Sequence, residues 1–208
     1  MNIIKKGERM STTLKITKDM ILDTAFSIAR KSGIEKVSNR EIAKRLNCSI
    51  RPIYYQFKNV KELNSELLKK IDDYFYKYLF ENINQDIPKY KQVGINYIKF
   101  ASCEKELFKI LFMSEFDLAV SDFVKGNSYG YQNILTFIKE SNGVSTDVSS
   151  FHVKMWIFAH GIASLVATNT IHLTDDEISN LLSSEFQALM LLEENPDNKW
   201  KIIPKNSY

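Results

Sequence analysis

Cysteine is scarce in this 208-residue chain, which holds only Cys48 and Cys103. The two lie far apart, and neither stands in a CxxC spacing or near a histidine that could complete a metal-ligand pattern. Disulfide frameworks and zinc sites both need closely patterned cysteines. The sequence therefore predicts neither.

Histidine is also rare, and its distribution argues against a metal site. All three histidines, His152, His160 and His172, fall within or just after one predicted helix. His152 and His160 are eight residues apart, which places them on roughly the same helical face. Further ligands would have to come from the few aspartates nearby, so we expect no metal.

Helix-breaking residues and long apolar runs are both few. Four prolines and seven glycines favour an all-α chain. The most apolar stretch, residues 155–167, is too short to span a bilayer. The opening MNIIKKGERM has too few apolar residues for a signal peptide. We therefore expect a cytoplasmic protein with no membrane partner.

Catalytic signatures are missing as well. The sequence contains no GxSxG elbow, phosphate-binding loop, dinucleotide fingerprint or HExxH pair. We predict a protein that is not an enzyme, with no catalytic residues and no cofactor.

Positive charge is concentrated at the front of the chain. Residues 1–70 hold 16 Lys/Arg and 7 Asp/Glu, a net of +9, whereas the remainder holds 12 and 18, a net of −6. Clustered basic charge is the footprint of phosphate binding. A merely solvated charged surface is the alternative, and the next motif makes it the weaker one.

Residues 38–57, SNREIAKRLNCSIRPIYYQF, have the pattern of a helix-turn-helix. Ser38 can cap a first helix, with Glu41 completing a capping box. Asn47 tolerates the left-handed conformation that often ends such a helix. Pro52 fits only in the first turn of a second helix, which would be the one that reads the major groove. The inward stripe of the first helix consists of Ile42, Ala43 and Leu46.

Residues 16–68 resemble the DNA-binding domain of the tetracycline-repressor (TetR/AcrR) family. The resemblance rests on the opening helix ILDTAFSIARKSG, on the helix-turn-helix, and on the motif IYYQF at residues 53–57, which corresponds to LYxHF. Gln56 stands where the family has His, and the second lysine of the usual Lys-x-Lys is displaced to Lys61, with Val60 in its place. This displacement puts one phosphate contact in doubt.

The resemblance implies a two-domain, all-α plan of about nine helices. A three-helix helix-turn-helix domain at 16–68 would follow a flexible basic arm at 1–15. A helical effector-binding and dimerisation domain at 69–195 would precede a tail at 196–208. Four helices are expected in front and about five behind, with the last two at about residues 147–169 and 175–193.

The resemblance also assigns DNA contacts. Arg40 and Arg51 would read bases, and the apolar Ile50 and Pro52 suit thymine methyl groups. Phosphate contacts would fix the register. The residues expected at phosphates are Asn39, Ser49, Tyr54, Lys58 and Lys61, and Tyr55 of the aromatic motif completes the DNA-binding set. Phe57 is expected in the core, and Tyr54 equally in the core or at DNA.

The rear domain carries the segment Trp156-Ile157-Phe158-Ala159-His160-Gly161, which is similar to a Trp-x-x-x-His-Gly motif in a TetR subclass. Trp156 and His160 share one helical face. They either line an effector cavity or form a hydrogen-bonded core pair near a dimer seam. Effector contacts are predicted at Phe112, Phe116, Trp156 and His160. For a cationic ligand, Glu115 or Asp117 would supply the carboxylate.

These observations predict a one-component transcriptional regulator. It would most simply be a repressor that binds double-stranded palindromic operator DNA as a homodimer through its last two long helices. A small, largely apolar effector would release it. An effector-independent accessory DNA-binding protein and an activator of the same fold are the alternatives. The interface residues expected on the two helices are Ile162, Leu165, Val166, Leu181, Leu182, Phe186, Leu189 and Met190.

Overall fold

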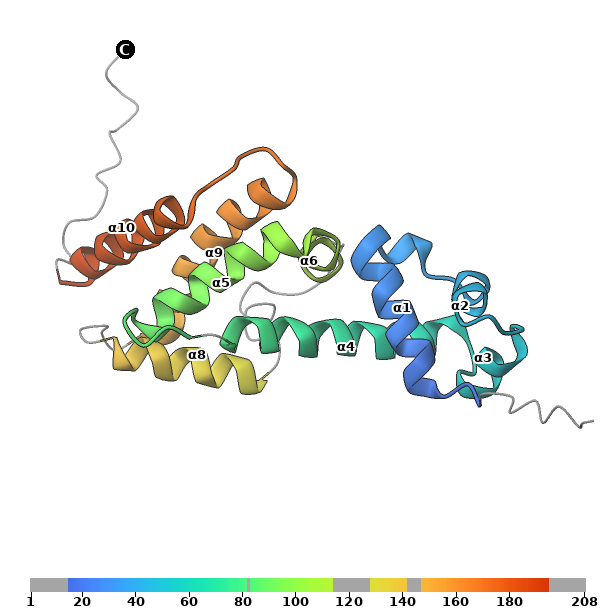
Figure 1. The fold of residues 1–208 in the computed structure, drawn as a ribbon. Helices are drawn as coiled ribbons and strands as arrows, with labels where there is room; N and C mark the ends of the chain where they lie inside the picture. Colours follow the sequence, from blue (N-terminus) through green and yellow to red (C-terminus); the bar gives the residue numbers. More distant parts are fainter. Residues whose placement is uncertain (1–14, 82, 114–127, 142–146, 195–208) are drawn as a thin grey trace, which may run out of the picture. The chain divides into compact units, whose positions relative to one another are not determined.

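The computed structural model describes residues 15–81, 83–113, 128–141 and 147–194. Nearly all of the expected N-terminal arm, the C-terminal tail, and Glu115, Phe116 and Asp117 lie outside these ranges. Within them the structure has nine α-helices, one short 3₁₀ helix and no strand, which confirms the all-α prediction (Figure 1). None of these helices combines the length and apolar character that crossing a membrane requires.

The chain divides into two compact units, of which the first ends at Leu68. Its elements are α1 (Lys18–Ser32), η1 (Ile34–Lys36), α2 (Asn39–Arg45), α3 (Arg51–Gln56) and the first part of α4 (Val60–Phe80). Apolar side chains from every α-helix of this unit meet in one core. They include Ile21, Ala25, Ile28, Ile42, Ile53, Leu63 and Leu67, each no more than 1% exposed.

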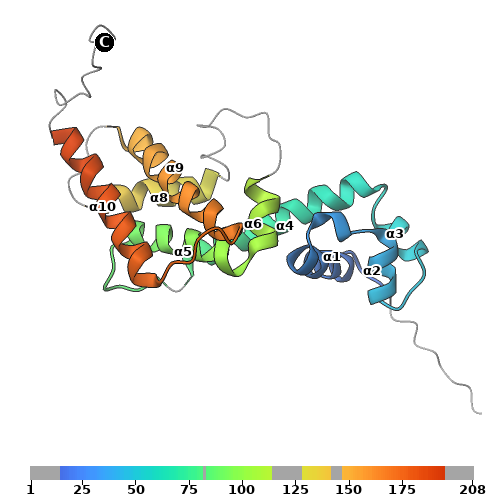
Figure 2. The ribbon, with the colours of Figure 1, turned by 90° about the horizontal axis from the view of Figure 1, so that it is seen from above.

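The second unit begins within α4, and its described residues form five further helices. These are α5 (Lys89–Cys103), α6 (Lys105–Phe112), α8 (Ser128–Glu140), α9 (Val148–Ala167) and α10 (Asp175–Glu194). Helix α5 is central, because it packs against α6, α8, α9 and α10 (Figures 1 and 2). The largest fully buried side chains here are Phe100, Phe108 and Phe151.

Helix α4 carries a stripe of buried side chains along its length. Leu63, Leu67, Ile71, Phe75 and Leu79 are all buried, at successive spacings of four residues. Residues four apart are neighbours on the surface of an α-helix. The same helix therefore supplies core residues to the first unit and to the second.

Both long C-terminal helices begin at side-chain caps. Asp147 accepts a hydrogen bond from the backbone N–H of Ser150 at 2.9 Å, which opens α9. At α10, Thr174 Oγ1 accepts from the Glu177 N–H at 3.3 Å, and the Glu177 carboxylate accepts from the Thr174 N–H at 2.7 Å. This reciprocal pair is a capping box.

Candidate DNA-binding face and effector cavity

The first helix of the helix-turn-helix begins where the sequence predicts. Ser38 Oγ accepts a hydrogen bond from the Glu41 N–H at 3.2 Å, so Ser38 is the N-cap of α2. The Glu41 carboxylate does not return to this cap. It accepts a hydrogen bond from Arg45 Nε at 3.0 Å, one turn further along α2.

The turn and the start of α3 also follow prediction. Asn47 has φ 50°, the left-handed conformation that Asn tolerates. The Cys48 N–H donates to the Ala43 carbonyl at 3.0 Å and closes the turn. Helix α3 then opens at Arg51, with Pro52 in its first turn, where no intrahelical N–H bond is lost.

Helix α3 has one inward and one outward face. Ile53 is fully buried and Phe57, directly after the helix, is 2% exposed, as predicted for core residues. Arg51 is exposed, and Tyr54 and Tyr55 are 59% and 85% exposed. Tyr54 therefore lies at the surface, which leaves its phenol free for contact with DNA.

The other residues of the predicted DNA-binding set lie close to α3 in sequence, and none of them is fully buried. Arg40, Ser49, Lys58 and Lys61 are exposed, and Asn39, Ile50 and Pro52 are half-buried. Within the described part of the chain, no ion pair occupies the side chains of Arg40, Arg51, Lys58 or Lys61. Their charges are therefore available to phosphates.

The second unit encloses a cavity of about 770 Å³. This volume lies within the roughly 300–1,000 Å³ that is typical of small-molecule sites. Helices α4, α5, α6, α8, α9 and α10 all contribute to its wall, together with residues 85–88. The apolar lining includes Phe75, Leu79, Val93, Tyr97, Phe112, Ile134, Phe137, Met155, Trp156, Ala159, Leu182 and Phe186.

Two of the four predicted effector residues line this cavity. Phe112 packs edge-on against Phe75 and Tyr97, with ring centroids 5.0 and 5.6 Å apart, and Trp156 lines the wall from α9. His160 is not a lining residue. It stacks on Trp156, with ring centroids 4.7 Å apart. Phe116 lies outside the described residues.

Tyr97 connects Trp156 and His160 through its phenol. The Tyr97 oxygen lies 2.8 Å from His160 Nδ1, and it also receives a hydrogen bond from Trp156. Burial raises the pKa of Tyr97, whereas the hydrogen bond from Trp156 lowers it. Burial likewise lowers the pKa of His160. The phenol thus stays protonated and the imidazole neutral, and Nε2 of His160 lies 3.4 Å from the Ser164 hydroxyl.

The expected hydrogen-bonded Trp156–His160 pair is thus a stacked pair whose hydrogen bonds converge on Tyr97. Sequence spacing placed the two rings on one face correctly. It could not show a partner on another helix, because the separation along the chain is 63 residues.

His152 is a functional candidate that the sequence reasoning did not select. It lines the cavity, is only 6% exposed, and its Nδ1 lies 3.1 Å from the Tyr90 hydroxyl. Burial lowers its pKa to about 4 and raises the pKa of Tyr90. The sequence feature that could have identified His152 is its position two helical turns before His160, on the same helical face.

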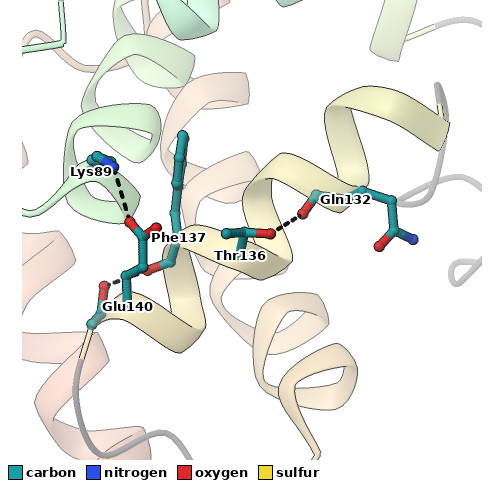
Figure 3. Close-up of polar contacts among 6 residues, drawn as sticks. Lys89, Gln132, Thr136, Phe137 and Glu140 are labelled. Carbon is teal, nitrogen blue, oxygen red and sulfur yellow. Dashed lines mark hydrogen bonds and ion pairs between the residues drawn. The ribbon is translucent and has the colours of Figure 1, made fainter.

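Charged residues from α5 and α8 line part of the cavity wall, and Figure 3 shows two of them, Lys89 and Glu140, joined as an ion pair. Lys89 at the start of α5 pairs with Glu140 near the end of α8 at 3.0 Å, and its ammonium lies 5.2 Å from the centroid of the Phe137 ring. Lys91 also lines the cavity, and no ion pair neutralises it among the described residues. No group of three or more possible metal ligands occurs in the described ranges.

Comparison with known proteins connects the first unit to a family. Residues 21–67 match the family model for bacterial regulatory proteins of the tetR family. The matched residues lie within the N-terminal unit and include its helix-turn-helix. The match ends before the Trp156–Gly161 segment, so it carries no information about the Trp-x-x-x-His-Gly subclass. A search of curated proteins found no match.

Solved structures of TetR-family regulators share the whole fold. A TetR-family transcriptional regulator from Vibrio parahaemolyticus superimposes with a TM-score of 0.62 at 17% identity, covering 82% of this chain and 96% of the other. FadR from Bacillus subtilis, in complex with stearoyl-CoA, gives 0.57 at 18% identity and covers 84% and 98%. A TetR-like regulator from Rhodococcus sp. RHA1 gives 0.56 at 15%, covering 83% and 94%. The TetR-type plan of a helix-turn-helix domain followed by a helical domain therefore extends along this chain.

Proposed function

We propose that this protein is a one-component transcriptional repressor that binds a palindromic operator as a homodimer and is released by a small, largely apolar effector. The observation that carries the proposal is that α4 contributes side chains to both units. Its first half supplies Leu63 and Leu67 to the core of the TetR-type domain, and its second half supplies Phe75, Tyr76 and Leu79 to the cavity wall. Because α4 is continuous, a ligand that displaces this wall would act on the TetR-type domain through the same helix.

DNA recognition is assigned to the outward face of α3 and its surroundings. Arg51 is positioned in the first turn of the recognition helix, where a side chain can reach base edges. Arg40, Ile50 and Pro52 complete the proposed base-reading set. Phosphate contacts are assigned to Asn39, Ser49, Tyr54, Tyr55, Lys58 and Lys61.

Dimerisation is assigned to α9 and α10, through a set of side chains that keeps Leu165 and Leu181 from the set expected from the sequence. Ile162, Val166, Leu182 and Leu189 are buried within the protomer, so they are not available to a partner. Apolar side chains that stay exposed on the two helices are Ile157, Leu165, Leu181, Leu191 and Leu192, at 38–60%. A Cβ at Gly161 would meet nothing within 4 Å, which leaves room for a partner helix. Two such faces related by a twofold axis would form an isologous interface.

Phe112 and Trp156 are the proposed effector contacts. His160 stacks on Trp156 but does not itself line the cavity. Because the cavity wall is mainly aromatic and aliphatic, it favours an apolar ligand over a charged one. The Bacillus subtilis neighbour holds stearoyl-CoA, so acyl thioesters are the first compounds to test. Phe116 stays a predicted contact.

Two linked measurements test this function. Selection from a random DNA library should yield a palindromic site, and a thermal-shift screen should identify a ligand that also lowers affinity for that site. A ligand stabilises the state that it binds, and it releases DNA only by binding the free form more tightly. Recovery of no preferred sequence, or a stabilising ligand without effect on operator affinity, would contradict the proposal.

A further inference from the structure

His152 is paired at Nδ1 with a buried tyrosine. The Tyr90 hydroxyl lies 3.1 Å from His152 Nδ1, and burial keeps the phenol protonated, so it can donate to that nitrogen. A neutral imidazole that accepts at one nitrogen carries its proton on the other. In this arrangement the proton of His152 is on Nε2.

The Nε2–H group has no protein partner among the described residues. Tyr131 approaches the His152 ring with a centroid separation of 5.9 Å, but its hydroxyl is 2.7 Å from Ser149 Oγ. Nε2 is not among the fully buried side-chain atoms that lack a partner in the described residues, so the atom is accessible from the cavity. His152 is 94% buried and lines the cavity, so an acceptor inside the cavity is the group that would satisfy it.

The polar and apolar parts of the cavity lie at different levels of α5 and α9. Tyr90 lies in the first turn of α5, between Lys89 and Lys91, and His152 is the fifth residue of α9. Phe112, Tyr97 and Trp156 form a second level. Tyr97 follows Tyr90 by seven residues, which corresponds to about 10 Å along a helix. A ligand that spans both levels needs a polar end and an apolar body.

We infer that Nε2–H of His152 is the hydrogen-bond donor that recognises the effector. The effector accordingly carries a carbonyl or carboxylate oxygen at the end of an apolar body that extends toward Phe112 and Trp156. This assignment rests on the proposed function, since it names the ligand class of the same cavity. It adds a specificity-determining residue that the aromatic composition alone does not indicate.

The test compares three probes that share a ten-carbon tail: decanoate, methyl decanoate and 1-chlorodecane. Affinity is measured by displacement of the uncharged dye N-phenyl-1-naphthylamine. His152→Phe should weaken both oxygen-bearing probes about tenfold, the loss expected for one hydrogen bond to a neutral donor. Affinity for 1-chlorodecane should change by less than about twofold, since the phenyl ring preserves the apolar contact.

Matched variants separate hydrogen bonding from packing. His172→Phe alters an exposed histidine that does not line the cavity, and it should leave all three affinities unchanged. His152→Gln keeps an N–H donor and should retain more affinity for the two oxygen-bearing probes than His152→Phe. Equal weakening of all three probes by His152→Phe, or no weakening, would overturn the inference.

A measurement on the unaltered chain covers the case in which His152→Phe does not fold. With ¹⁵N-labelled histidine, the His152 Nε2–H resonance should be present in the free protein and shift on addition of decanoate or methyl decanoate. An Nδ1–H tautomer, or a resonance that neither probe moves, would refute the assignment. If 1-chlorodecane alone binds and releases operator, the inference fails and the proposed function stands. If the oxygen-bearing probes bind through His152 without changing operator affinity, the repressor mechanism fails and the donor assignment stands.

Discussion

Tyr97 and His160 are joined by a 2.8 Å contact between the phenol oxygen and Nδ1, across two helices that are distant in sequence. The same phenol receives a hydrogen bond from Trp156, which lines the cavity. Hydrogen bonds among Tyr97, His160 and Trp156 thus hold this part of the cavity wall in place. A wall of this kind can hold Trp156 in one orientation before any ligand enters.

Tyr97→Phe should destabilise the second unit. The substitution removes one oxygen and leaves the Trp156 N–H and His160 Nδ1 without their shared partner, a loss worth about 1–3 kcal/mol. Urea denaturation followed by tryptophan fluorescence measures the free energy of unfolding. Tyr55→Phe, at a position that is 85% exposed, is the matched control and should change that free energy by less than about 0.5 kcal/mol. Equal stability of Tyr97→Phe and the natural chain would show that the network contributes nothing.

Stability should fall on acidification through His152. Its pKa is lowered from 6.5 to about 4 in the folded protein, so between these values the unfolded chain binds a proton that the folded chain does not. Stability is therefore fully present above pH 6.5 and is lost as the pH falls toward 4, by roughly 3 kcal/mol at about 1.36 kcal/mol per pKa unit. Chemical denaturation at a series of pH values measures this slope.

His152→Gln provides the control for that slope, because glutamine does not titrate. The variant should lose much of the pH dependence between 6.5 and 4, while His172→Phe should keep it. An unchanged slope in His152→Gln would mean that other groups carry the acid sensitivity.

Arg51→Ala and Lys58→Ala should affect DNA binding in different ways. Loss of a bidentate base contact at Arg51 should relax preference at one base pair, by about 1–3 kcal/mol. Loss of a phosphate contact at Lys58 should weaken all sequences alike and reduce the salt dependence of binding. Binding-site selection with each variant distinguishes the two effects. An unaltered specificity profile for Arg51→Ala would refute its role as a base reader.

Leu165→Glu should prevent dimerisation. Leu165 is 44% exposed on the α9 face that contains Gly161, and a carboxylate there would be buried unpaired in the proposed interface. Sedimentation at micromolar concentration should show a monomer, whereas Lys139→Glu, at an exposed position on α8, should stay dimeric. A monomeric natural chain would contradict the proposed interface altogether.

Local sequence signals predicted most of the fold. The Ser38 cap, the left-handed Asn47, Pro52 in the first turn of α3 and the Thr174–Glu177 capping box all involve residues within a few positions of each other. Such interactions have fixed spacings, so a pattern identifies them. The buried stripe of α4 was predictable for the same reason, because helical periodicity repeats every 3.6 residues.

The cavity was less predictable, because its polar contacts join separate helices. Tyr90 meets His152 across 62 residues and Tyr97 meets His160 across 63, and no spacing rule connects them. Interface residues posed a similar difficulty. Ile162 and Leu165 are equally apolar in sequence, yet packing within the protomer buries the first and leaves the second exposed.

The most direct test of the account is a titration of the selected operator with the protein, in the absence and presence of saturating methyl decanoate or an acyl thioester, followed by fluorescence anisotropy. The account predicts dimeric binding to the palindromic site and a loss of affinity of at least about fivefold on ligand addition, the lower end of typical coupling between sites. Phe112→Ala should abolish the response to the ligand without weakening DNA binding. Operator affinity that is the same with and without a ligand shown to occupy the cavity would contradict the central claim.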